Sequence, residues 1–455
     1  MKRRLTTIVL LLLAMAAMAG KQPKYVFYFI GDGMGPSHVI GTELYLGEKE
    51  GVIGRPQKLC FTQFPVTSFV TTFSASNGVT DSAASGTALA TGEKTNNGCI
   101  GVTPDGTPVY SVAHYAKEAG YAVGITTTVC INHATPGAFY AHQKSRSHYP
   151  QIAKEMLTAG YDFYAGGDPV CSDEERSALY AQAQSEGYAI ARGYDDYRSK
   201  RQASRMMLYQ KDVATEIPYT IDRSSNDLTL AQITEAGIDF LMSKKKKGFF
   251  MMVEGGKIDY ASHDNDAATM MHEVLDFDAA IAVALDFYNK HKDETLIIVT
   301  ADHETGGLVL GFNGSYTLNL KALAGQHTSE DELGNTLIAA AGKGTLTWDE
   351  AKSILTNEMG LWSSAKIDEK QSARLKELFD SAAAATDKEQ RDSKLRSLAN
   401  LAKHYVSYTA AISWASGNHS GTFVPLFAIG KGAELFGGVI DNTDIPKLIR
   451  KAARY

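Results

Sequence analysis

Apolar runs alternate with amphipathic segments along most of the chain, from residue 25 to about residue 310. Four segments with helical periodicity, each followed by an apolar run, predict helix–strand pairs: 109–119 with 121–127, 151–159 with 161–165, 228–242 with 248–253, and 269–288 with 295–300. A further strand is predicted over 423–429 and a last helix over 445–453. Strands joined by helices indicate parallel pairing, so we expect an α/β fold with a large, mostly parallel central sheet flanked by helices.

The segment from residue 325 to 411 departs from this alternation, because it is charged, rich in alanine and without strand-like runs. Thr347, followed three residues later by Glu350, forms a capping box that predicts the start of a helix. Further helical patterns cover 367–384 and 387–408. Strand-like sequence then resumes. We therefore expect a helical insertion at 325–411, crown-like or lid-like, before the last core strands of a catalytic core built from 20–324 and 412–455.

The first 19 residues have the composition of a signal peptide. Three basic residues at 2–4 precede a short apolar stretch over 8–14, and Ala17-Met18-Ala19 is a small-residue cleavage site. The apolar stretch is too short for a comfortable membrane span. We expect export of the protein, a periplasmic or secreted location, and no membrane span once 1–19 are removed.

Loss of these residues changes the formal net charge from −6 to −9, because three cations leave with them. An acidic mature chain lacks the basic footprint of nucleic-acid binding, so no nucleic-acid partner is expected. Four cysteines, Cys60, Cys99, Cys130 and Cys171, could form two disulfides in any of three pairings, and their spacing does not choose among them.

Three of the apolar runs end on side chains that bind metal ions. Asp32 follows the run over 25–30, Glu254 follows 248–253, and the pair Asp302-His303 follows 295–300 with one alanine between. Ligands bind outside the carboxyl ends of strands in open α/β sheets, so these side chains could meet in one polynuclear metal site. Each motif alone has an ordinary alternative, such as a glycine turn or a polar helix cap.

The spacing of the remaining candidates adds detail to this hypothesis. Asp259 and His263 are four residues apart, so a helical turn would put both on one face, ready to share an ion. The adjacent Asp302 and His303 could converge on an ion from a loop, whereas a strand would point them to opposite faces. His419 lies between glycines just before a predicted strand, where an exposed loop histidine is the alternative.

Two further residues point to phosphate chemistry. A helix predicted to begin near Ser82 would place this hydroxyl where backbone N–H groups and the helix dipole favour an anion. A metal ion nearby would lower the pKa of the hydroxyl and make it a nucleophile. Arg146 follows a loop that contains His133 and Thr135, and its planar guanidinium suits bidentate binding of phosphate. In isolation, Ser82 could be an ordinary helix cap and Arg146 an ordinary surface residue.

The motifs together resemble those of the alkaline phosphatases, over nearly the whole mature chain. They occur in the family's order: GDGMG at 31–35, TDSAAS at 80–85, HATP at 133–136 with Arg146 eleven residues after Thr135, VEGGKID with a histidine four residues on at 253–263, ADH at 301–303, and HSG at 419–421. TDSAAS together with the motif at 253–263 is the most specific part of the match.

The resemblance implies an exported zinc-dependent phosphomonoesterase that releases inorganic phosphate and forms homodimers. Ser82 would be the nucleophile that becomes phosphorylated, and Arg146 would bind the phosphate. The family's metal ligands map onto three groups: Asp259, His263 and His419 for one zinc, Asp32, Asp302 and His303 for a second, and Asp32, Thr135 and Glu254 for a magnesium. His133 and Tyr260 stand at positions that vary within the family, and His133 is not counted as a ligand.

Two other functions remain open from the sequence. One is a phosphodiesterase or phosphonate hydrolase of the same superfamily, and the other is a non-catalytic protein that binds phosphate or metal. A sulfatase is disfavoured, because the Cys/Ser-x-Pro-x-Arg motif is not present at the nucleophile. The natural substrate and the role of 325–411 are not determined by the sequence.

Overall fold

The structure is a computed structural model that describes residues 22–52, 54–312 and 316–455. The predicted signal peptide at 1–19 lies outside the described residues. Within the described ranges, no helix is both long enough and apolar enough to cross a membrane.

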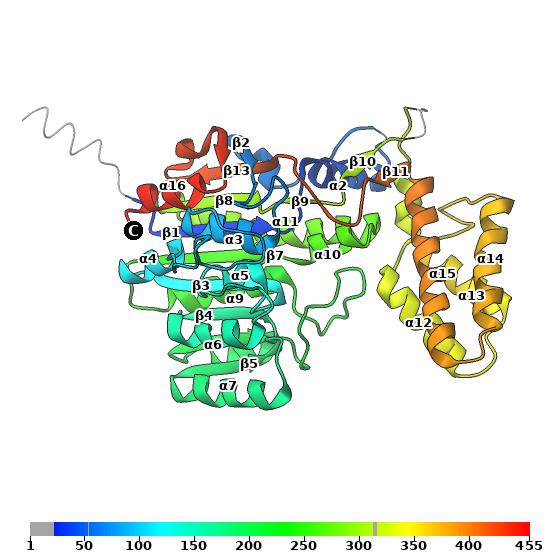
Figure 1. Ribbon diagram of the computed structural model, residues 1–455. Coiled ribbons are helices and arrows are strands. Elements are labelled where there is room, and N and C mark those ends of the chain that lie inside the picture. Colours follow the sequence, from blue (N-terminus) through cyan, green and yellow to red (C-terminus); the bar gives the residue numbers. More distant parts are fainter. Residues whose placement is uncertain (1–21, 53, 313–315) are drawn as a thin grey trace, which may run out of the picture.

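A ten-stranded sheet forms the centre of the molecule (Figure 1). In sheet order the strands are β14 (Gly438–Asp441), β2 (Val66–Thr71), β13 (Val424–Gly430), β8 (Thr295–Ala301), β1 (Tyr25–Gly31), β7 (Phe249–Gly255), β3 (Ala122–Cys130), β4 (Phe163–Gly167), β6 (Arg205–Tyr209) and β5 (Tyr188–Arg192). Every pairing is parallel except the two made by β13, which runs antiparallel to β8 and β2. The predicted large, mostly parallel α/β sheet is therefore confirmed.

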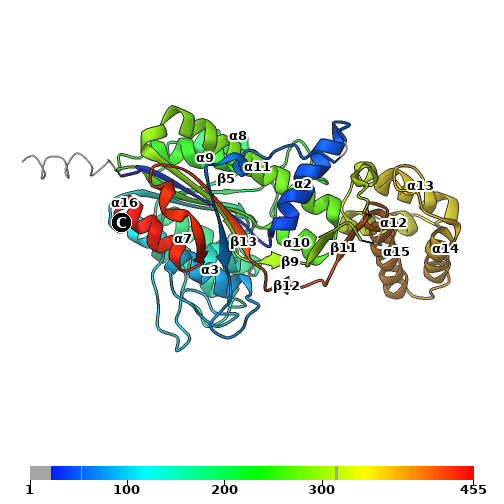
Figure 2. The ribbon, with the colours of Figure 1, turned by 90° about the horizontal axis from the view of Figure 1, so that it is seen from above.

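Helices cover both faces of the sheet (Figure 2). One face carries α8 (Gly193–Lys200), α9 (Leu230–Met242) and α11 (Ala267–Lys290); the other carries α3 (Ser82–Thr91), α4 (Val112–Glu118), α6 (Tyr149–Ala159), α7 (Asp173–Ser185) and α16 (Asp444–Ala453). With both faces covered, the central strands β1, β7 and β8 are buried at almost every position. This burial explains why their sequences are continuous apolar runs rather than alternating patterns.

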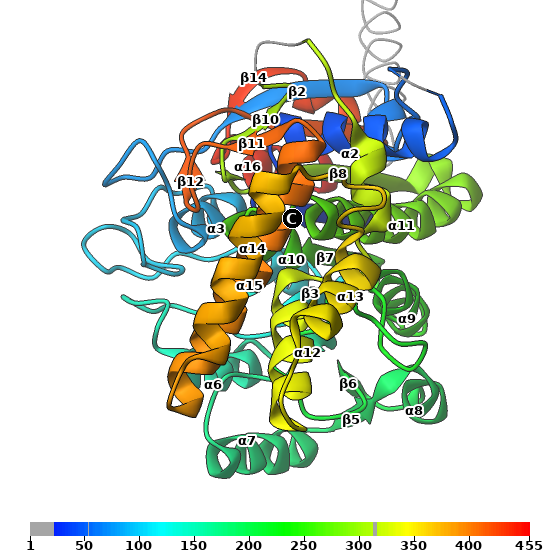
Figure 3. The same cartoon turned by 90° about the vertical axis from the view of Figure 1, so that its right-hand side faces the viewer.

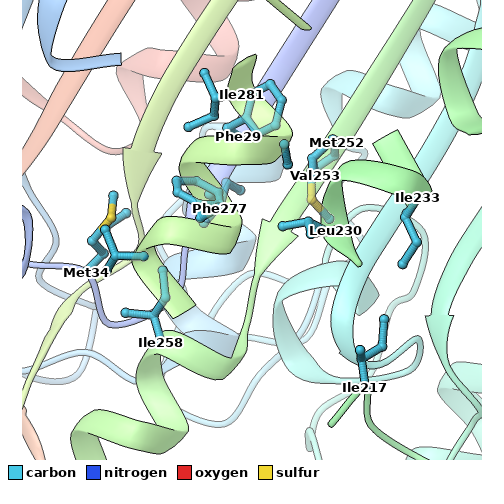
Figure 4. Close-up of a cluster of buried hydrophobic side chains, with 14 of the residues drawn as sticks. Phe29, Met34, Ile217, Leu230, Ile233, Met252, Val253, Ile258, Phe277 and Ile281 are labelled. Atoms are coloured by element: carbon cyan, nitrogen blue, oxygen red, sulfur yellow. The ribbon is translucent and has the colours of Figure 1, made fainter. Parts of the chain in front are cut away.

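The core beneath α9 and α11 is built from aliphatic and aromatic side chains (Figure 4). Phe29 of β1 and Val253 of β7 lie under Phe277 and Ile281 of α11, and all four are fully buried. The rings of Phe29 and Phe277 meet edge to face, with centroids 5.9 Å apart, an arrangement that aromatic pairs favour. This packing holds α11 against the strands that end at the candidate site.

The central strands end at the same level. Gly31 at the end of β1 pairs in register with Gly255 of β7 and with Ala301 of β8. The residues at and just beyond these positions therefore gather at one edge of the sheet. Three helices frame this edge: α2 (Pro36–Lys49), α5 (Ala134–Gly137) and α10 (Lys257–His263).

Four helices between 330 and 409 lie to one side of the sheet and outside its two covering layers (Figures 1 and 3). They are α12 (Glu330–Gly342), α13 (Trp348–Met359), α14 (Glu369–Ala383) and α15 (Lys388–Thr409). The predicted capping box is present, because the Thr347 hydroxyl accepts from the Glu350 N–H at 3.3 Å. A two-stranded ribbon of β10 (Leu308–Leu310) and β11 (Ile412–Trp414) carries the chain out of the core and back.

Four strands of the ten-stranded sheet were not marked by the apolar pattern, namely β2, β5, β6 and β14. Those four are short or half exposed, so they lack the long apolar runs of the central strands. The strand predicted at 161–165 begins two residues later, at Phe163. The reason is local: Gly160 ends α6 in the left-handed conformation, and Asp162 accepts a hydrogen bond from the Val123 N–H before the strand starts.

Candidate active site

Carboxylates and histidines from separate strands meet at the edge where β1, β7 and β8 end. Asp32, Glu254, Asp302 and His303 are all fully buried there. Gly33 permits this crowding: its φ is +74°, and an added Cβ would lie 2.9 Å from Asp259 Oδ1, so a residue with a side chain would be excluded. Burying several carboxylates together is costly unless positive charge compensates them.

Asp32, Asp302 and His303 form one candidate metal group. His303 Nε2 lies 3.3 Å from Asp32 Oδ1 and 3.2 Å from Asp302 Oδ2. Because β8 ends at Ala301, the adjacent Asp302 and His303 lie on a loop and converge, as one of the two alternatives predicted. The other oxygen of Asp302 accepts from the N–H groups of Gly33 and His303, which leaves Oδ2 facing the group.

Asp259, His263 and His419 form a second cluster. The one-turn spacing on α10 brings His263 Nε2 within 3.3 Å of Asp259 Oδ2, and His419 Nε2 lies 3.2 Å from His263 Nε2. The other ring nitrogens face backbone carbonyls, His263 Nδ1 at 2.7 Å from Gly417 O and His419 Nδ1 at 2.8 Å from Thr80 O. Such contacts orient metal-binding histidines, so both Nε2 atoms are directed at the cluster.

The two groups are joined through His303. A metal-compatible set with all ligand atoms within 4.8 Å of one another is made by Asp259, His303 and His419. The rings of His303 and His419 stack at 3.6 Å between centroids. Thr305 also links the groups, because its hydroxyl donates to Asp259 and contacts His303 Nδ1 at 3.2 Å. The sequence reasoning missed Thr305, although it lies only two residues beyond the ADH motif.

A third group surrounds Asp32 on its other side. Asp32, His133 and Glu254 place ligand atoms within 4.8 Å of one another, so His133, which was not counted as a ligand, lies at the site. Thr135 is fully buried, and its hydroxyl has no hydrogen-bond partner among the described residues. The same holds, across the described part of the chain, for both carboxylate oxygens of Asp32 and of Glu254.

These orphaned oxygens show that the donor set suits divalent cations. Burial raises the pKa of Glu254 to about 8 and that of Asp302 to about 7, and it also raises the pKa of Asp32 well above its ordinary value. A bound cation would favour the charged forms and satisfy the oxygens. Mixed nitrogen and oxygen ligands suit zinc, whereas the oxygens around Glu254 suit magnesium.

Histidine and aspartate stabilise each other's charge in the second cluster. The hydrogen bond to Asp259 raises the pKa of His263 to about 9, against the effect of burial. Burial opposes ionisation of Asp259, but the same hydrogen bond and the surrounding histidines outweigh it and lower its pKa. The cluster therefore holds an ion pair between His263 and Asp259.

Ser82 occupies the first position of α3, as predicted. Its Oγ lies 3.1 Å from His303 Nε2, and the residue is almost completely buried. Asp81 caps the helix by accepting from the Ala84 N–H at 2.9 Å. The hydroxyl thus sits at a helix N-terminus and beside a ligand shared by two metal groups, an environment that favours an anionic reactant.

Arg146 reaches the same place from the loop after α5. Its Nη1 lies 3.2 Å from Asp81 Oδ2, and its Nη2 lies 3.0 Å from His133 Nε2. Burial opposes the charge of Arg146, but Asp81 and Asp32 outweigh it and raise its pKa. Asp81 is thus a positioning residue for Arg146 that the sequence reasoning treated only as part of a motif.

All ten side chains predicted for the site lie at this edge of the sheet. The four cysteines lie apart from each other as free thiols. The fold and the site together define the class: an α/β enzyme with clustered candidate metal ligands at the carboxyl edge of a parallel sheet.

Comparisons with known proteins identify the family. The family model described as alkaline phosphatase matches residues 23–165 and 176–455. Alkaline phosphatase 3 of Bacillus subtilis is 33% identical over 441 residues, covering 95% of this chain and 89% of that protein, and alkaline phosphatase 4 of the same organism is 32% identical over 449 residues, covering 96% and 90%. The chain belongs to the alkaline phosphatase family and is a phosphoric monoester hydrolase.

Solved structures agree with this assignment. The cold-active alkaline phosphatase of a psychrophilic Shewanella species superposes with a TM-score of 0.80 at 31% identity, covering 94% of this chain and 99% of that one. The alkaline phosphatase of Thermus thermophilus gives a TM-score of 0.77 at 25% identity, covering 96% and 93%.

Proposed function

We propose that the protein is an exported alkaline phosphatase that hydrolyses phosphate monoesters through a phosphoserine intermediate on Ser82, with two zinc ions and one magnesium ion per chain. The observation that carries the proposal is the contact between Ser82 Oγ and His303 Nε2 at 3.1 Å, at the start of α3. A hydroxyl that only capped a helix would have no need of a buried metal-binding histidine beside it.

The metal assignment follows the three groups. Asp259, His263 and His419 would hold one zinc, and Asp32, Asp302 and His303 would hold the other. Thr135 and Glu254, with Asp32, would hold the magnesium. Bound there, divalent ions supply Lewis-acid charge to the phosphate oxygens and lower the pKa of the serine hydroxyl and of a water.

His133 affects which metal ion the third group of ligands binds most tightly. In the metal-free protein, burial and the charge of Arg146 lower the pKa of His133 to about 3, so its imidazole is neutral and able to act as a ligand. Two variants of the TAB5 alkaline phosphatase, in which a histidine is replaced by glutamate or aspartate, are described with magnesium bound in the M3 site. We infer that the neutral nitrogen of His133 weakens magnesium binding in this chain, because magnesium prefers oxygen ligands.

The residues then perform two displacements at phosphorus. Ser82 Oγ releases its proton to solvent and attacks phosphorus. The bond between phosphorus and the alcohol oxygen breaks, and the departing alkoxide takes a proton from water. A water next attacks the phosphoserine, which frees Ser82 and releases inorganic phosphate.

Charge that develops on the transferred phosphoryl group is neutralised by the protein. Arg146 contacts Asp81 and His133 through its two Nη atoms, and in the proposed mechanism its planar guanidinium binds two phosphate oxygens. The free N–H groups at the start of α3 act on the same oxygens. The serine and the attacking water both react in their deprotonated forms, and high pH favours these forms. We therefore expect turnover to be fastest at alkaline pH.

The proposal extends to location and assembly. Residues 1–19 direct export to the periplasm or the outside, and the mature chain forms a homodimer. Residues 20–324 and 412–455 make up the catalytic core, and 325–411 are an insertion into it.

Ser82→Ala tests the covalent mechanism. We expect turnover of p-nitrophenyl phosphate to fall by about 10³-fold or more, because the nucleophile is lost. Ser172→Ala, which removes a capping hydroxyl at the exposed start of α7, is the matched control and should keep full activity. A phosphate-trapping measurement should find labelled protein only when Ser82 is present. Full turnover by Ser82→Ala would rule out the phosphoserine pathway, and faster hydrolysis of a diester than of the monoester would favour a phosphodiesterase.

A further inference from the structure

Ser85 joins the helix of the nucleophile to the loop that carries two candidate metal ligands. It lies three residues after Ser82 on α3, so both hydroxyls leave the same face of the helix. Ser82 Oγ lies 3.1 Å from His303 Nε2, and Ser85 Oγ donates to the backbone carbonyl of Asp302 at 2.6 Å. Ser85 is only 1% exposed and takes no part in the displacements at phosphorus. Its hydrogen bond therefore serves to hold the two elements together.

The carbonyl that Ser85 binds belongs to the peptide between Asp302 and His303. The N–H of the same peptide donates to Asp302 Oδ1 at 3.0 Å, so the peptide is held on both sides. Asp302 Oδ2 has no hydrogen-bond partner among the described residues, and it lies 3.2 Å from His303 Nε2. Rotation of this peptide would break the bond to Ser85 and would move both candidate ligands together.

A third side chain, Asn442, extends this connection to the turn between β14 and α16. Asn442 is fully buried, and its Nδ2 lies 3.0 Å from Ser85 Oγ. Its backbone N–H donates to the Thr71 carbonyl of β2 at 3.0 Å. A Cβ added to Gly92, just after α3, would lie 3.1 Å from the Thr443 carbonyl, and α16 packs beside α3 (Figure 2). The turn that contains Asn442 is therefore packed closely against the nucleophile helix.

Lys94 determines which way round the amide of Asn442 lies. Its ammonium group can only donate; it lies 2.7 Å from Asn442 Oδ1 and 3.0 Å from Asp441 Oδ2. The amide oxygen therefore faces Lys94, and the amide nitrogen donates to Ser85. A serine hydroxyl has a single proton, and that of Ser85 is left for the carbonyl of Asp302. The residue types thus fix the direction of each of these hydrogen bonds.

We propose that Asn442 is a positioning residue of the active site, which acts through the Ser85 hydroxyl to hold the Asp302-His303 peptide against α3. The inference rests on the proposed function, in which this peptide carries two ligands of one zinc ion and His303 lies beside the nucleophile. Loss of residues that orient metal ligands lowers metal affinity or activity about 10- to 100-fold. Asn442 should therefore affect zinc binding and kcat, even though it acts through Ser85 and not on a ligand directly.

Asn442→Asp tests this direction of hydrogen bonding. The new side chain has the same shape and still accepts from Lys94, but its carboxylate cannot donate to Ser85. Its second oxygen competes instead for the Ser85 proton, which weakens the bond to the Asp302 carbonyl. Ser85→Ala removes that bond outright. Both variants should bind one of the two zinc ions about tenfold more weakly and should lower kcat about tenfold at saturating zinc, with KM within about twofold of the wild type.

A double variant shows whether the two residues act in sequence. Because Asn442 acts through Ser85, Asn442→Asp should have no further effect in the Ser85→Ala background, so the two losses should not add. Damage that each substitution caused independently would give additive losses.

Two matched controls separate positioning from general loss of hydrogen bonds. Thr443→Val alters the same turn, but the hydroxyl that it removes bonds to Asp441 Oδ1 and not to Ser85. Thr234→Val removes a fully buried hydroxyl of α9, which bonds to the Leu230 carbonyl. Both controls should keep wild-type zinc affinity and wild-type kcat.

Zinc affinity is measured by titrating the metal-free protein against a chelating indicator, and the thermal midpoint of the zinc-loaded protein checks that each variant folds. Asn442→Asp preserves the shape of the side chain, so its titration stands on its own where Ser85→Ala lowers the midpoint. Wild-type zinc affinity in Asn442→Asp, additive losses in the double variant, or an equal loss in Thr443→Val would overturn the inference. Absence of monoester hydrolysis by the metal-loaded wild type would instead overturn the proposed function, whereas the zinc titrations do not depend on turnover.

Discussion

Asp32 and His303 are the residues on which the site converges, because Asp32 belongs to two of the candidate metal groups and His303 joins its own group to the Asp259 cluster. Both are fully buried, and neither oxygen of Asp32 has a hydrogen-bond partner in the described part of the chain. A carboxylate buried in this way costs folding free energy unless a cation compensates it. At the scale of residues, the buried carboxylates of the site therefore require positive charge from a bound cation.

The pH dependence of the metal-free protein follows from these residues. Burial raises the pKa of Asp302 to about 7 and of Glu254 to about 8, and the hydrogen bond to Asp259 raises that of His263 to about 9. In the unfolded chain the carboxyls lose their protons near pH 4 and histidine near pH 6.5. Between about pH 6.5 and pH 9 the folded state therefore binds more protons, so its stability falls as the pH rises.

Thermal unfolding of chelator-treated protein measures this effect. We expect the midpoint to decrease from pH 6.5 to pH 9, and Glu254→Gln to flatten the decrease, because the amide does not titrate. Protein reloaded with zinc and magnesium should lose most of the dependence. A midpoint of the metal-free protein that rises across this interval would contradict the assigned shifts.

At the scale of elements, the packing of α11 against β7 holds the end of this strand in place at the candidate site. Phe277 of this helix is fully buried and packs against Gly255 of β7, where an added Cβ would lie 2.8 Å from the ring. Gly255 follows Glu254, so the helix presses on the strand directly beside a candidate ligand. The packing shown in Figure 4 is thus part of what positions the carboxylate.

Removal of this ring should destabilise the whole protein. Phe277→Ala deletes a buried aromatic side chain, and we expect the free energy of unfolding in urea to fall by about 3–5 kcal/mol. Val213→Ala, at an exposed loop position, is the control and should change it by less than about 0.5 kcal/mol. A loss below about 1 kcal/mol for Phe277→Ala would mean that α11 does not support the strand edge as described.

At the scale of the whole molecule, the helices of 330–409 are attached through the ribbon of β10 and β11 and through the packing of α15 against β11. The chain leaves the core after the ligands of the ADH motif and returns just before His419. The helical segment is therefore connected at both ends to segments that carry candidate metal ligands.

The proposed assembly gives a measurable composition. We expect light scattering on the purified mature protein to give twice the mass of one chain, and metal analysis to give two zinc ions and one magnesium ion per chain. The first result follows from the resemblance to homodimeric enzymes, the second from the three ligand groups. A monomeric mass would remove the dimer from the proposal, and one metal ion per chain would remove the two-zinc assignment.

The sequence by itself determined the elements and the kinds of ligand. Long apolar runs became β1, β7 and β8 because strands buried on both faces need continuous hydrophobic sequence. The residues just after these runs named Asp32, Glu254, Asp302 and His303 as candidate ligands, whereas Thr135 was named through the resemblance to the alkaline phosphatases. Short or half-exposed strands such as β2 and β14 carried too little signal, and the antiparallel direction of β13 depends on where the chain re-enters the sheet.

Only the tertiary structure decided which of these side chains meet. Ser82 and His303 are 221 residues apart, and their contact depends on the common level at which β1, β7 and β8 end. The structure likewise places His133 in the third group, and it shows that Asp81 forms an ion pair with Arg146. The physical reason is that sequence periodicity records burial along one element, whereas a metal site depends on the register between elements far apart in the chain.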